Sequence, residues 1–304
     1  MELKITVVIV TYNGAIWLEK NLNSLQKSNY PLSIMIVDNA STDNTLEIAS
    51  KFPQVEIIKS EINLGFGKAN NLGIIKALEN GADAVFLLNQ DTWIYENTLS
   101  ILIKKLNSNP DFGILSPMHY SANEITLDEN FQIYYNRKIA ELSSEKLVVV
   151  PFVNAAAWLI SKKCLEKVGL FEPIFNHYGE DRNYCDRVCF QGFKIGIALE
   201  SSICHDRTIV RNFKKDILQS QYKVLNALLN INQSLFNSYL HGFKEVVGLP
   251  KFFFRFYGFI KSVQILFSLF IYYMNLLFDI NKISKTRKDS KEGKTGKLIR
   301  TNAK

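Results

Sequence analysis

The sequence predicts an α/β fold in which a mostly parallel, Rossmann-like central sheet is flanked by helices and followed by a C-terminal helical extension. Three observations support this prediction. Short apolar runs alternate with helical stretches through the first 118 residues, polar residues gather directly after the apolar runs, and the pattern becomes wholly helical after residue 212. The chain has 304 residues, of which 47% are hydrophobic and 21% charged, so it can bury a large core and is not intrinsically disordered.

Each apolar run is expected to be a buried strand. In the first half the strands span residues 4–10, 33–37, 55–59 and 84–88, and the helices between them span residues 15–28, 42–51, 66–79 and 96–107. Residues 119–150 lack periodicity and are expected to form an excursion or hairpin from a sheet edge. Strands at 148–153, 156–160 and 195–199, with helices at 162–168 and 180–191, complete a domain of residues 1–211.

Residues 251–278 form a strongly apolar stretch, and residues 262–278 contain no charged side chain. That length is at the lower edge of the roughly 17 to 25 residues that span a bilayer. Polar positions recur at steps of three and four and trace one helical stripe: Lys261, Gln264, Ser268, Tyr272, Asn275, Asp279 and Lys282. The stripe favours a helix that lies in a membrane interface over one that crosses the membrane. The alternatives are a helix packed on the rest of the protein and a helix that pairs two copies into a homo-oligomer.

The excess of basic residues that gives the formal net charge of +7 lies entirely in the C-terminal tail. Residues 281–304 contain nine Lys or Arg and two acidic residues, so the first 280 residues are neutral overall. A nucleic-acid-binding fold would spread its basic charge over a groove, so we expect no nucleic-acid partner. Basic residues beside an apolar helix are attracted to anionic lipids at about 1 kcal/mol each. We therefore predict a membrane-associated region over residues 212–280 and a disordered basic tail over residues 281–304.

The cysteine content and the N-terminus predict a reducing, cytoplasmic compartment, with the protein peripheral on the inner face of the cell membrane. No signal peptide pattern precedes the first strand, and the four cysteines lie within 41 positions. Cys185 and Cys189 have helical spacing, and Cys204 adjoins His205, which allows a zinc cluster. The sequence contains no Cys-x-x-Cys pair, so small apolar side chains in a core are the better explanation.

Polar side chains follow three predicted strands at their carboxyl ends. They are Thr11, Tyr12, Asn13, Asp38, Asn39, Asn89 and Asp91. Ligands of open α/β sheets bind at this edge, so these residues are expected to line a site. Polar residues are also common wherever strands end in turns, so each cluster is informative only together with the others.

Six sequence blocks occur in a specific order. They are VIVTYNG at 8–14, IVDNASTDNT at 36–45, NLGFGKANNLG at 63–73, LLNQDT at 87–92, YGEDRNYCDR at 178–187 and CHDRT at 204–208. Together they resemble the family 2 glycosyltransferases of the GT-A fold, with most similarity to the rhamnosyltransferase and galactofuranosyltransferase branch. The resemblance covers about residues 4–207. It implies inverting transfer of a sugar from a nucleotide-sugar donor to a saccharide or lipid-linked saccharide in cell-surface polysaccharide synthesis. Residues 1–118 would form the nucleotide-sugar half and residues 119–211 the acceptor half.

The resemblance assigns donor contacts to the first three blocks. Asp38 would accept the N3 hydrogen of a pyrimidine base, with Thr11, Tyr12, Asn13 and Asn39 beside it. Asn13 is equally well explained as a turn residue. In the third block, Gly67 permits close backbone approach and Asn70 would reach the diphosphate or ribose. Lys68 is equally well explained as a solvated surface residue.

A divalent metal is implied by the fourth and sixth blocks. Asp91 stands where the family carries its Asp-x-Asp motif, and its hard oxygen ligand suits Mg²⁺ or Mn²⁺ bridging the donor phosphates. Asn89 replaces the first acidic residue of that motif, which lowers the charge of the site. His205 matches the downstream histidine of the family, a second metal ligand, although a buried histidine with no ligand role is equally expected.

Acceptor activation is implied by the fifth block. Glu180 and Asp181 match the acidic pair of the family, in which the Asp deprotonates the acceptor hydroxyl. The helix dipole alone also favours acidic residues at this position. The family usually has Asp where this chain has Asn183, which puts one acceptor contact in doubt. Trp158 falls beside the acceptor groove, where it would stack on a sugar ring or lie in the core.

Two other functions compete with this one. A sugar nucleotidyltransferase shares the layout but normally needs a glycine-rich, basic loop after the first strand, where this chain has TYNG. A non-catalytic scaffold that binds nucleotide sugars is suggested by the two amides at Asn89 and Asn183.

Overall fold

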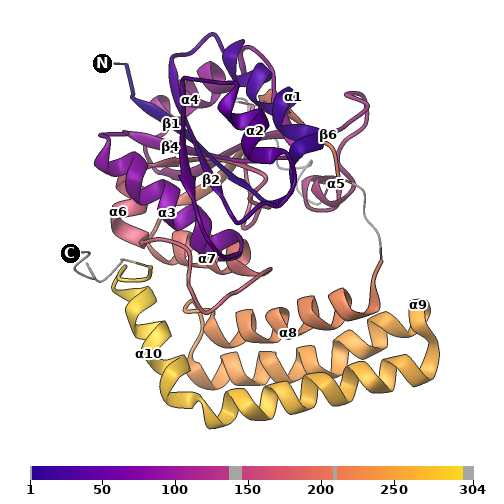
Figure 1. Ribbon diagram of the computed structural model, residues 1–304. Helices are drawn as coiled ribbons and strands as arrows, with labels where there is room; N and C mark the ends of the chain where they lie inside the picture. The colour runs from indigo at the N-terminus through magenta and orange to yellow at the C-terminus, as the bar shows by residue number, and fades with distance from the viewer. Residues whose placement is uncertain (1, 137–145, 208–210, 297–304) are drawn as a thin grey trace.

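The computed structural model describes residues 2–136, 146–207 and 211–296, and it shows a sheet domain above a layer of helices (Figure 1). Within these ranges one sheet runs in the order β3-β2-β1-β4-β8-β6-β9-β5, with β7 beside β9. The strands are β1 Ile5–Thr11, β2 Leu32–Asp38, β3 Val55–Lys59, β4 Ala84–Asn89, β5 Thr92–Ile94, β6 Phe112–Ser121, β7 Leu147–Val149, β8 Ala157–Ser161 and β9 Lys194–His205. The predicted α/β class, with a central sheet flanked by helices, is confirmed.

The helices of the sheet domain follow the predicted alternation closely. They are α1 Ala15–Gln26, α2 Thr45–Ser50, α3 Phe66–Glu79, α4 Thr98–Ser108, α5 Glu129–Asn136, α6 Lys162–Val168 and α7 Glu180–Phe190. The helices predicted at 66–79 and 162–168 match α3 and α6 residue for residue. Propensity and apolar spacing agree in these segments, so local sequence is enough to define them.

The sheet is mixed, which corrects the expectation of a mostly parallel one. Strands β3, β2, β1 and β4 pair in parallel, but β8 lies antiparallel between β4 and β6. The downstream strand is also longer than predicted, because β9 continues from residue 199 to His205. Part of the expected excursion is β6 and α5, and its residues 137–145 lie outside the described residues. Strand direction depends on long-range connections, which apolar runs do not encode.

Alternating side chains of the strands fill two cores, one on each face of the sheet. Val7 and Ile9 point into the core covered by α1, α2 and α4, while Val8 points into the core covered by α3, α6 and α7. This period of two, apolar on both faces, is the reason the first strands read as continuous apolar runs. Three cysteines are buried, as the better of the two explanations for them predicted: Cys164, Cys185 and Cys204.

The C-terminal region is a helical layer with its own apolar core. It consists of α8 Phe213–Leu229, α9 Leu235–Phe278 and α10 Ile280–Lys291. α9 is interrupted at Gly258, whose φ of 70° and ψ of −171° suit glycine but few other residues. Figure 1 shows α9 folding back on itself beneath α8. By length and composition α9 could cross a membrane, with 28% of its most apolar window buried, but the break divides it into two shorter arms.

The basic tail is helical over its first part, which corrects the prediction of disorder for residues 281–296. Arg287 is 5% exposed and donates hydrogen bonds to three backbone carbonyls at the junction of α8 and α9. Further along, the amide of Leu170 donates to the carbonyl of Thr295. Arg287 remains buried because its donors are satisfied. The tail therefore straps the helical layer to the sheet domain, while residues 297–304 lie outside the described residues.

Candidate functional site

At the carboxyl ends of β1 and β2, both carboxylate oxygens of Asp38 accept hydrogen bonds. The two strands pair in parallel with Thr11 opposite Asp38. The Thr11 hydroxyl donates to Asp38 Oδ1 at 2.9 Å, and the amide of Ser41 donates to Oδ2 at 3.1 Å. Asp38 is 1% exposed, so these contacts fix its orientation at the edge where a nucleotide base is expected.

The turn after β1 presents an exposed aromatic ring. Tyr12 is 47% exposed, and its backbone is clamped by Gln90, which accepts from its N–H and donates to its carbonyl at 2.9 and 3.2 Å. Asn13 has a φ of 48°, and its side-chain oxygen accepts from the amide of Thr42 at 2.8 Å. Asn13 is therefore a turn residue that joins two loops, one of its two expected explanations. Gln90 was not singled out in the sequence, because nothing in its position signals a clamp on a distant strand.

Three predicted donor residues are buried in contacts within the protein. Asn39 is 3% exposed, donates to Asn63 Oδ1 and accepts from a backbone amide. Asn70 is 2% exposed and donates to the Phe66 carbonyl of its own helix at 3.0 Å. Gly67 is buried, and a Cβ at this position would lie 3.2 Å from the Phe171 Cβ, so the close backbone approach expected at Gly67 is an approach to Phe171. The Asn70 side chain is bonded to its own helix, which corrects the expectation that it reaches the diphosphate or ribose. Which way a helix residue faces depends on helix phase, which sequence blocks do not convey.

The short strand β5 brings Asp91 and His205 together, although they are far apart in the sequence. β5 pairs antiparallel with the end of β9, which places Thr92 opposite His205. The amide of Asp206 also donates to the Asp91 carbonyl at 2.8 Å. As a result, His205 Nε2 lies 3.3 Å from Asp91 Oδ1. The predicted pair is therefore adjacent, and Asn89 lies at the end of β4, in the same turn.

His205 lies between two carboxylates. Its Nδ1 is 3.4 Å from Asp128 Oδ2, and Asp128 also pairs with Arg207 at 3.1 Å. Both ring nitrogens are buried and neither has a well-aligned hydrogen bond. Burial lowers the pKa of His205, but the carboxylates of Asp128 and Asp91 outweigh burial and leave that pKa raised. Nε2 is thus a buried nitrogen that faces a partly exposed carboxylate, an arrangement in which both atoms can bind one cation.

Asp128 lies in the weakly patterned stretch of residues 119–150, where no motif marks it as a site residue. It accepts from the amide of Phe131 at 2.9 Å at the start of α5, and it is 3% exposed. An aspartate three residues before an apolar residue of a short helix is a capping signal that would have placed it at a helix start. Its second role, orienting His205, depends on tertiary contacts alone.

Glu180 and Asp181 open α7, as predicted. Gly179 precedes them with a φ of 88°, a left-handed conformation that glycine adopts without strain. Burial raises the pKa of Asp181 above its ordinary value. Burial and the nearby Asp181 carboxylate raise the pKa of Glu180 to about 7. One carboxylate oxygen of Glu180, which is 4% exposed, has no hydrogen-bond partner within the described ranges.

Asp181 and the turn that carries Asp91 are linked through one backbone segment. The amide of Asn89 donates to the Ala156 carbonyl at 2.9 Å, so the turn that carries Asp91 is held against the start of β8. The backbone of Ala155, one residue earlier, lies close enough to the Asp181 carboxylate to favour its charged form, which lowers its pKa against the raising effect of burial. Two residues of one segment thus connect Asp181 to the turn of Asp91, on one edge of the sheet.

Glu180 provides a prediction about stability and pH. A carboxyl whose pKa rises from 4.5 to about 7 on folding favours the folded state when protonated. That contribution is fully present below pH 4.5, is lost as the pH rises through 7, and amounts to at most about 3 kcal/mol. We expect Glu180→Gln to unfold at a higher temperature than wild type at pH 8 and with little difference at pH 5.

Thermal unfolding at the two pH values is the measurement, with the exposed Glu166→Gln as a matched control that should follow wild type. An identical pH dependence for Glu180→Gln and wild type would contradict the buried, raised-pKa carboxyl.

Trp158 and Asn183, the two residues discussed for the acceptor side, are both buried. Trp158 is 0% exposed and packs in one cluster with Phe171 and Tyr184, so it lies in the core, the second of its two expected explanations, and its assignment to the acceptor site is corrected. Its position on central strand β8 points it into the core below α3 and α7. Asn183 is 1% exposed and accepts from Arg187 Nε at 3.0 Å, so an amide replaces the usual carboxylate inside a buried network.

Two known proteins are similar to this chain in sequence. The dTDP-rhamnosyl transferase RfbF of Shigella flexneri is 29% identical over 222 residues, which cover 67% of this chain and 70% of the relative. The N-acetylglucosaminyl-diphospho-decaprenol L-rhamnosyltransferase of Mycobacterium tuberculosis is 32% identical over 122 residues, 37% of this chain and 40% of the relative.

A solved structure supports the GT-A fold. The mannosyltransferase PcManGT from Pyrobaculum calidifontis, in complex with GDP-Man and Mn²⁺, superposes with a TM-score of 0.61 at 18% identity. The match covers 96% of this chain and 84% of that one. The model of the family described as "Glycosyl transferase family 2" matches residues 6–169, more than half of the chain. With the acidic residues of its blocks gathered on one edge of a GT-A sheet, the chain belongs to glycosyl transferase family 2 and is a glycosyltransferase.

Proposed function

We propose that this glycosyltransferase transfers a sugar, with inversion, from a pyrimidine nucleotide sugar to a saccharide or lipid-linked saccharide. The observation that carries the proposal is the connection of Asp91, His205 and Asp181 on one edge of the sheet. The names of two relatives, a dTDP-rhamnosyl transferase and an N-acetylglucosaminyl-diphospho-decaprenol L-rhamnosyltransferase, support a dTDP-sugar donor and a lipid-linked acceptor.

The residues present fit a divalent cation, Mg²⁺ or Mn²⁺. Within the described ranges no three His, Cys, Asp or Glu side chains converge on one point, so the protein offers the pair Asp91 and His205. Mg²⁺ is commonly held by one or two carboxylates together with substrate phosphates, so a two-residue site suits an ion that arrives with the donor. Such an ion neutralises charge on a diphosphate leaving group.

The chain's own residues account for the acceptor half of the reaction. Asp181 accepts the proton of the acceptor hydroxyl, whose oxygen then forms a bond to the anomeric carbon. The bond from that carbon to the diphosphate breaks on the opposite side, which inverts the configuration. The raised pKa of Asp181 makes its carboxylate a stronger base than an exposed aspartate. Asp38 and Tyr12 lie at the carboxyl ends of β1 and β2, where they would hold the base of the donor.

The test is hydrolysis of a panel of dTDP-, UDP- and GDP-sugars by the purified full chain with Mn²⁺, Mg²⁺ or EDTA. We expect one pyrimidine donor to be bound and slowly hydrolysed, with loss of hydrolysis in EDTA. Binding of a donor without hydrolysis or transfer to any acceptor would instead support a scaffold. Formation of a nucleotide sugar from a sugar phosphate and a nucleoside triphosphate would support a nucleotidyltransferase.

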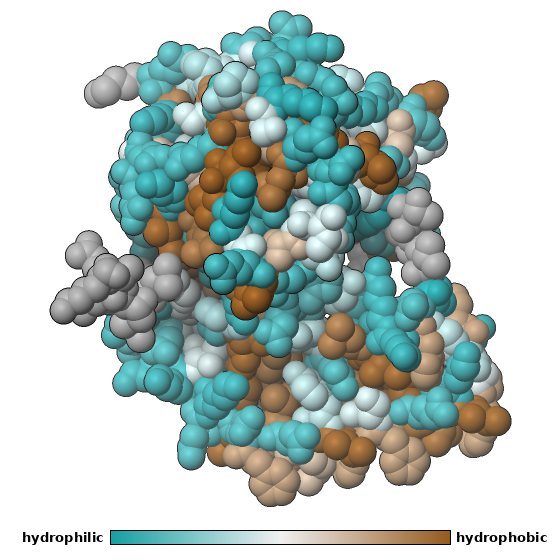
Figure 2. Space-filling model, in the orientation of Figure 1, coloured by the Kyte–Doolittle hydropathy of each residue, from teal (hydrophilic) through white to brown (hydrophobic). Residues whose placement is uncertain are grey.

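We also propose that the outer face of α9 lies on an anionic membrane surface, on the cytoplasmic side. Figure 2 shows apolar side chains along the lower edge of the molecule, over the helical layer. The exposed apolar residues of α9, here called the aromatic face, are Phe236, Leu240, Phe243, Val247, Phe252, Phe254, Phe256, Phe259, Ile260, Leu266, Phe267, Phe270, Ile271 and Phe278. α9 carries four basic residues against one acidic residue, Glu245, so its charge complements anionic lipid.

Cosedimentation with vesicles tests this surface. We expect the protein to bind vesicles that contain phosphatidylglycerol, and the double variant Phe259→Ser/Phe267→Ser to bind at least about tenfold more weakly, because two aromatic side chains no longer enter the lipid. The control is Ile125→Ser, since Ile125 is 81% exposed on the sheet domain. Equal vesicle binding by wild type and the double variant would show that the aromatic face does not meet lipid.

A further inference from the structure

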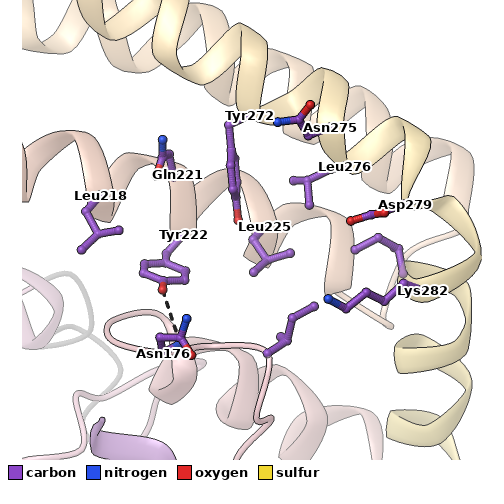
Figure 3. Close-up of a pocket in the computed structure, with 12 residues that line it drawn as sticks. Asn176, Leu218, Gln221, Tyr222, Leu225, Tyr272, Asn275, Leu276, Asp279 and Lys282 are labelled. Atoms are coloured by element: carbon purple, nitrogen blue, oxygen red, sulfur yellow. Dashed lines mark hydrogen bonds between the residues drawn. The ribbon is translucent and has the colours of Figure 1, made fainter. Parts of the chain in front are cut away.

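A cavity of about 300 Å³ lies between the sheet domain and the helical layer. Figure 3 shows its walls: α8 on one side, the end of α9 and the start of α10 on the other, and the loop that carries Asn176 below. Its volume is at the lower end of the about 300–1,000 Å³ typical of small-molecule sites. Nothing in the donor or base assignments above uses this cavity.

The lining has the mixed chemistry that suits a sugar. Asn176, Gln221 and Asn275 contribute amides, and Tyr222 and Tyr272 contribute phenol rings. Amides donate and accept at once, as vicinal hydroxyls require, and tyrosine offers an apolar face with a polar tip. Leu218, Leu225 and Leu276 supply the apolar remainder of the walls.

The charged groups of the lining cancel one another. Lys282 and Asp279 both line the cavity, and neither side chain is hydrogen-bonded or ion-paired to another residue in the part of the chain that the structure describes. One cation beside one anion does not favour a phosphate or a nucleotide, which would need a net positive lining. Both groups can instead hydrogen-bond hydroxyls of a neutral ligand.

The cavity adjoins the loop that positions the base. The amide of Asn176 donates to the Tyr222 hydroxyl at 3.3 Å, the hydrogen bond drawn in Figure 3. Three residues later, the Gly179 carbonyl accepts from Asn226 of α8 at 2.9 Å. Gly179 directly precedes Glu180 and Asp181. The same loop therefore forms one wall of the cavity and leads into the catalytic helix.

We propose that this cavity is an acceptor subsite, which binds a neutral sugar unit of the acceptor at a distance from the reacting hydroxyl. The inference rests on the proposed function, because it assumes an acceptor with more than one sugar or group. A sugar held here by α8, α9 and α10 would fix the approach of the chain end to Asp181. The helical layer would then contribute to acceptor specificity as well as to membrane binding.

Saturation-transfer NMR with methyl glycosides of rhamnose, galactose and N-acetylglucosamine tests the subsite, with UDP and dTDP present to fill the donor site. We expect at least one glycoside to receive saturation from wild type, and its signal to fall at least fivefold with Asn275→Ala and with Asp279→Ala. Asn281→Ala is the matched control, since Asn281 is exposed and does not line the cavity. Thermal unfolding checks that each variant is folded, and Tyr272→Leu serves as a second variant that removes the phenol ring and keeps an apolar wall.

Donor hydrolysis separates this proposal from the proposed function. We expect all four variants to hydrolyse the donor within twofold of wild type, because the cavity does not include the donor edge. Hydrolysis with no glycoside signal, or with a signal that the cavity variants leave unchanged, overturns the subsite alone. An absence of donor hydrolysis in wild type overturns the proposed function instead.

Discussion

Asp91→Ala is expected to lower metal-dependent donor hydrolysis and sugar transfer by about 10²- to 10³-fold. Asp91 is the carboxylate of the two-residue cation site, and its loss leaves His205 Nε2 without a partner oxygen at 3.3 Å. Stabilisation of a leaving diphosphate by a held cation is worth several kcal/mol, and about 1.4 kcal/mol corresponds to a tenfold change in rate. The measurement combines the rate of donor hydrolysis with Mn²⁺ affinity from electron paramagnetic resonance in the presence of donor.

Asp111→Ala is the matched control for Asp91→Ala. Asp111 pairs with Lys194 on the surface, ahead of β6 and β9, so its loss should leave both readouts within twofold of wild type. If Asp91→Ala bound metal and hydrolysed the donor as wild type does, Asp91 would not be a ligand of the proposed cation site.

Asp181→Asn is expected to reduce the turnover number of sugar transfer by about 10²- to 10⁴-fold, with donor affinity nearly unchanged. The substitution keeps the size of the side chain and removes the proton acceptor, and general base catalysis contributes about that factor. Because burial raises the pKa of Asp181, wild-type turnover should fall with decreasing pH at a higher pH than an exposed aspartate would produce. The turnover number of Asp181→Asn should not show this fall at low pH.

The control for the base is Asp186→Asn on the same helix. Asp186 is 8% exposed and pairs with Arg182 at 3.3 Å, so it tests the loss of a buried carboxylate from α7 without the loss of the base. Transfer by Asp181→Asn near the wild-type rate would refute the assigned base. An equal loss in Asp186→Asn would attribute the effect to the stability of α7.

The sequence singled out the residues of the proposed site more completely than the residues that surround them. Asp91, His205 and Asp181 were identified because each stands in a block whose order along the chain is specific, and the structure brings them to one edge of the sheet. Gly67 and Asn70 stand in another of these blocks, and the same resemblance placed Trp158 beside the acceptor groove, yet all three residues are buried. A sequence block shows which residue type occurs at a position. It does not show where the side chain points, because that direction depends on helix phase and strand register.

Asp128 and Gln90 contact residues of the proposed site, although the sequence did not single them out. Each orients a predicted residue, His205 and Tyr12 respectively, from a segment with no recognisable pattern. Contacts of this kind join residues 78 or 77 positions apart, and they arise only when the sheet is assembled. Side chains that support a site are therefore the part of it that local sequence does not reveal.

The sequence by itself determined the α/β class, the positions of α3 and α6, the polar edge of the sheet and the apolar character of α9, because these follow from local apolar spacing and turn residues. Only the tertiary structure decided that the sheet is mixed, that α9 folds back at Gly258, and that the basic tail is a strap held by Arg287. From the sequence alone, a tail rich in charged residues is expected to be solvated. The backbone carbonyls that accept the hydrogen bonds of Arg287 lie more than 50 residues away, so the sequence around Arg287 does not reveal them. Long-range hydrogen bonds outweigh the local preference for water once burial makes each unsatisfied donor costly.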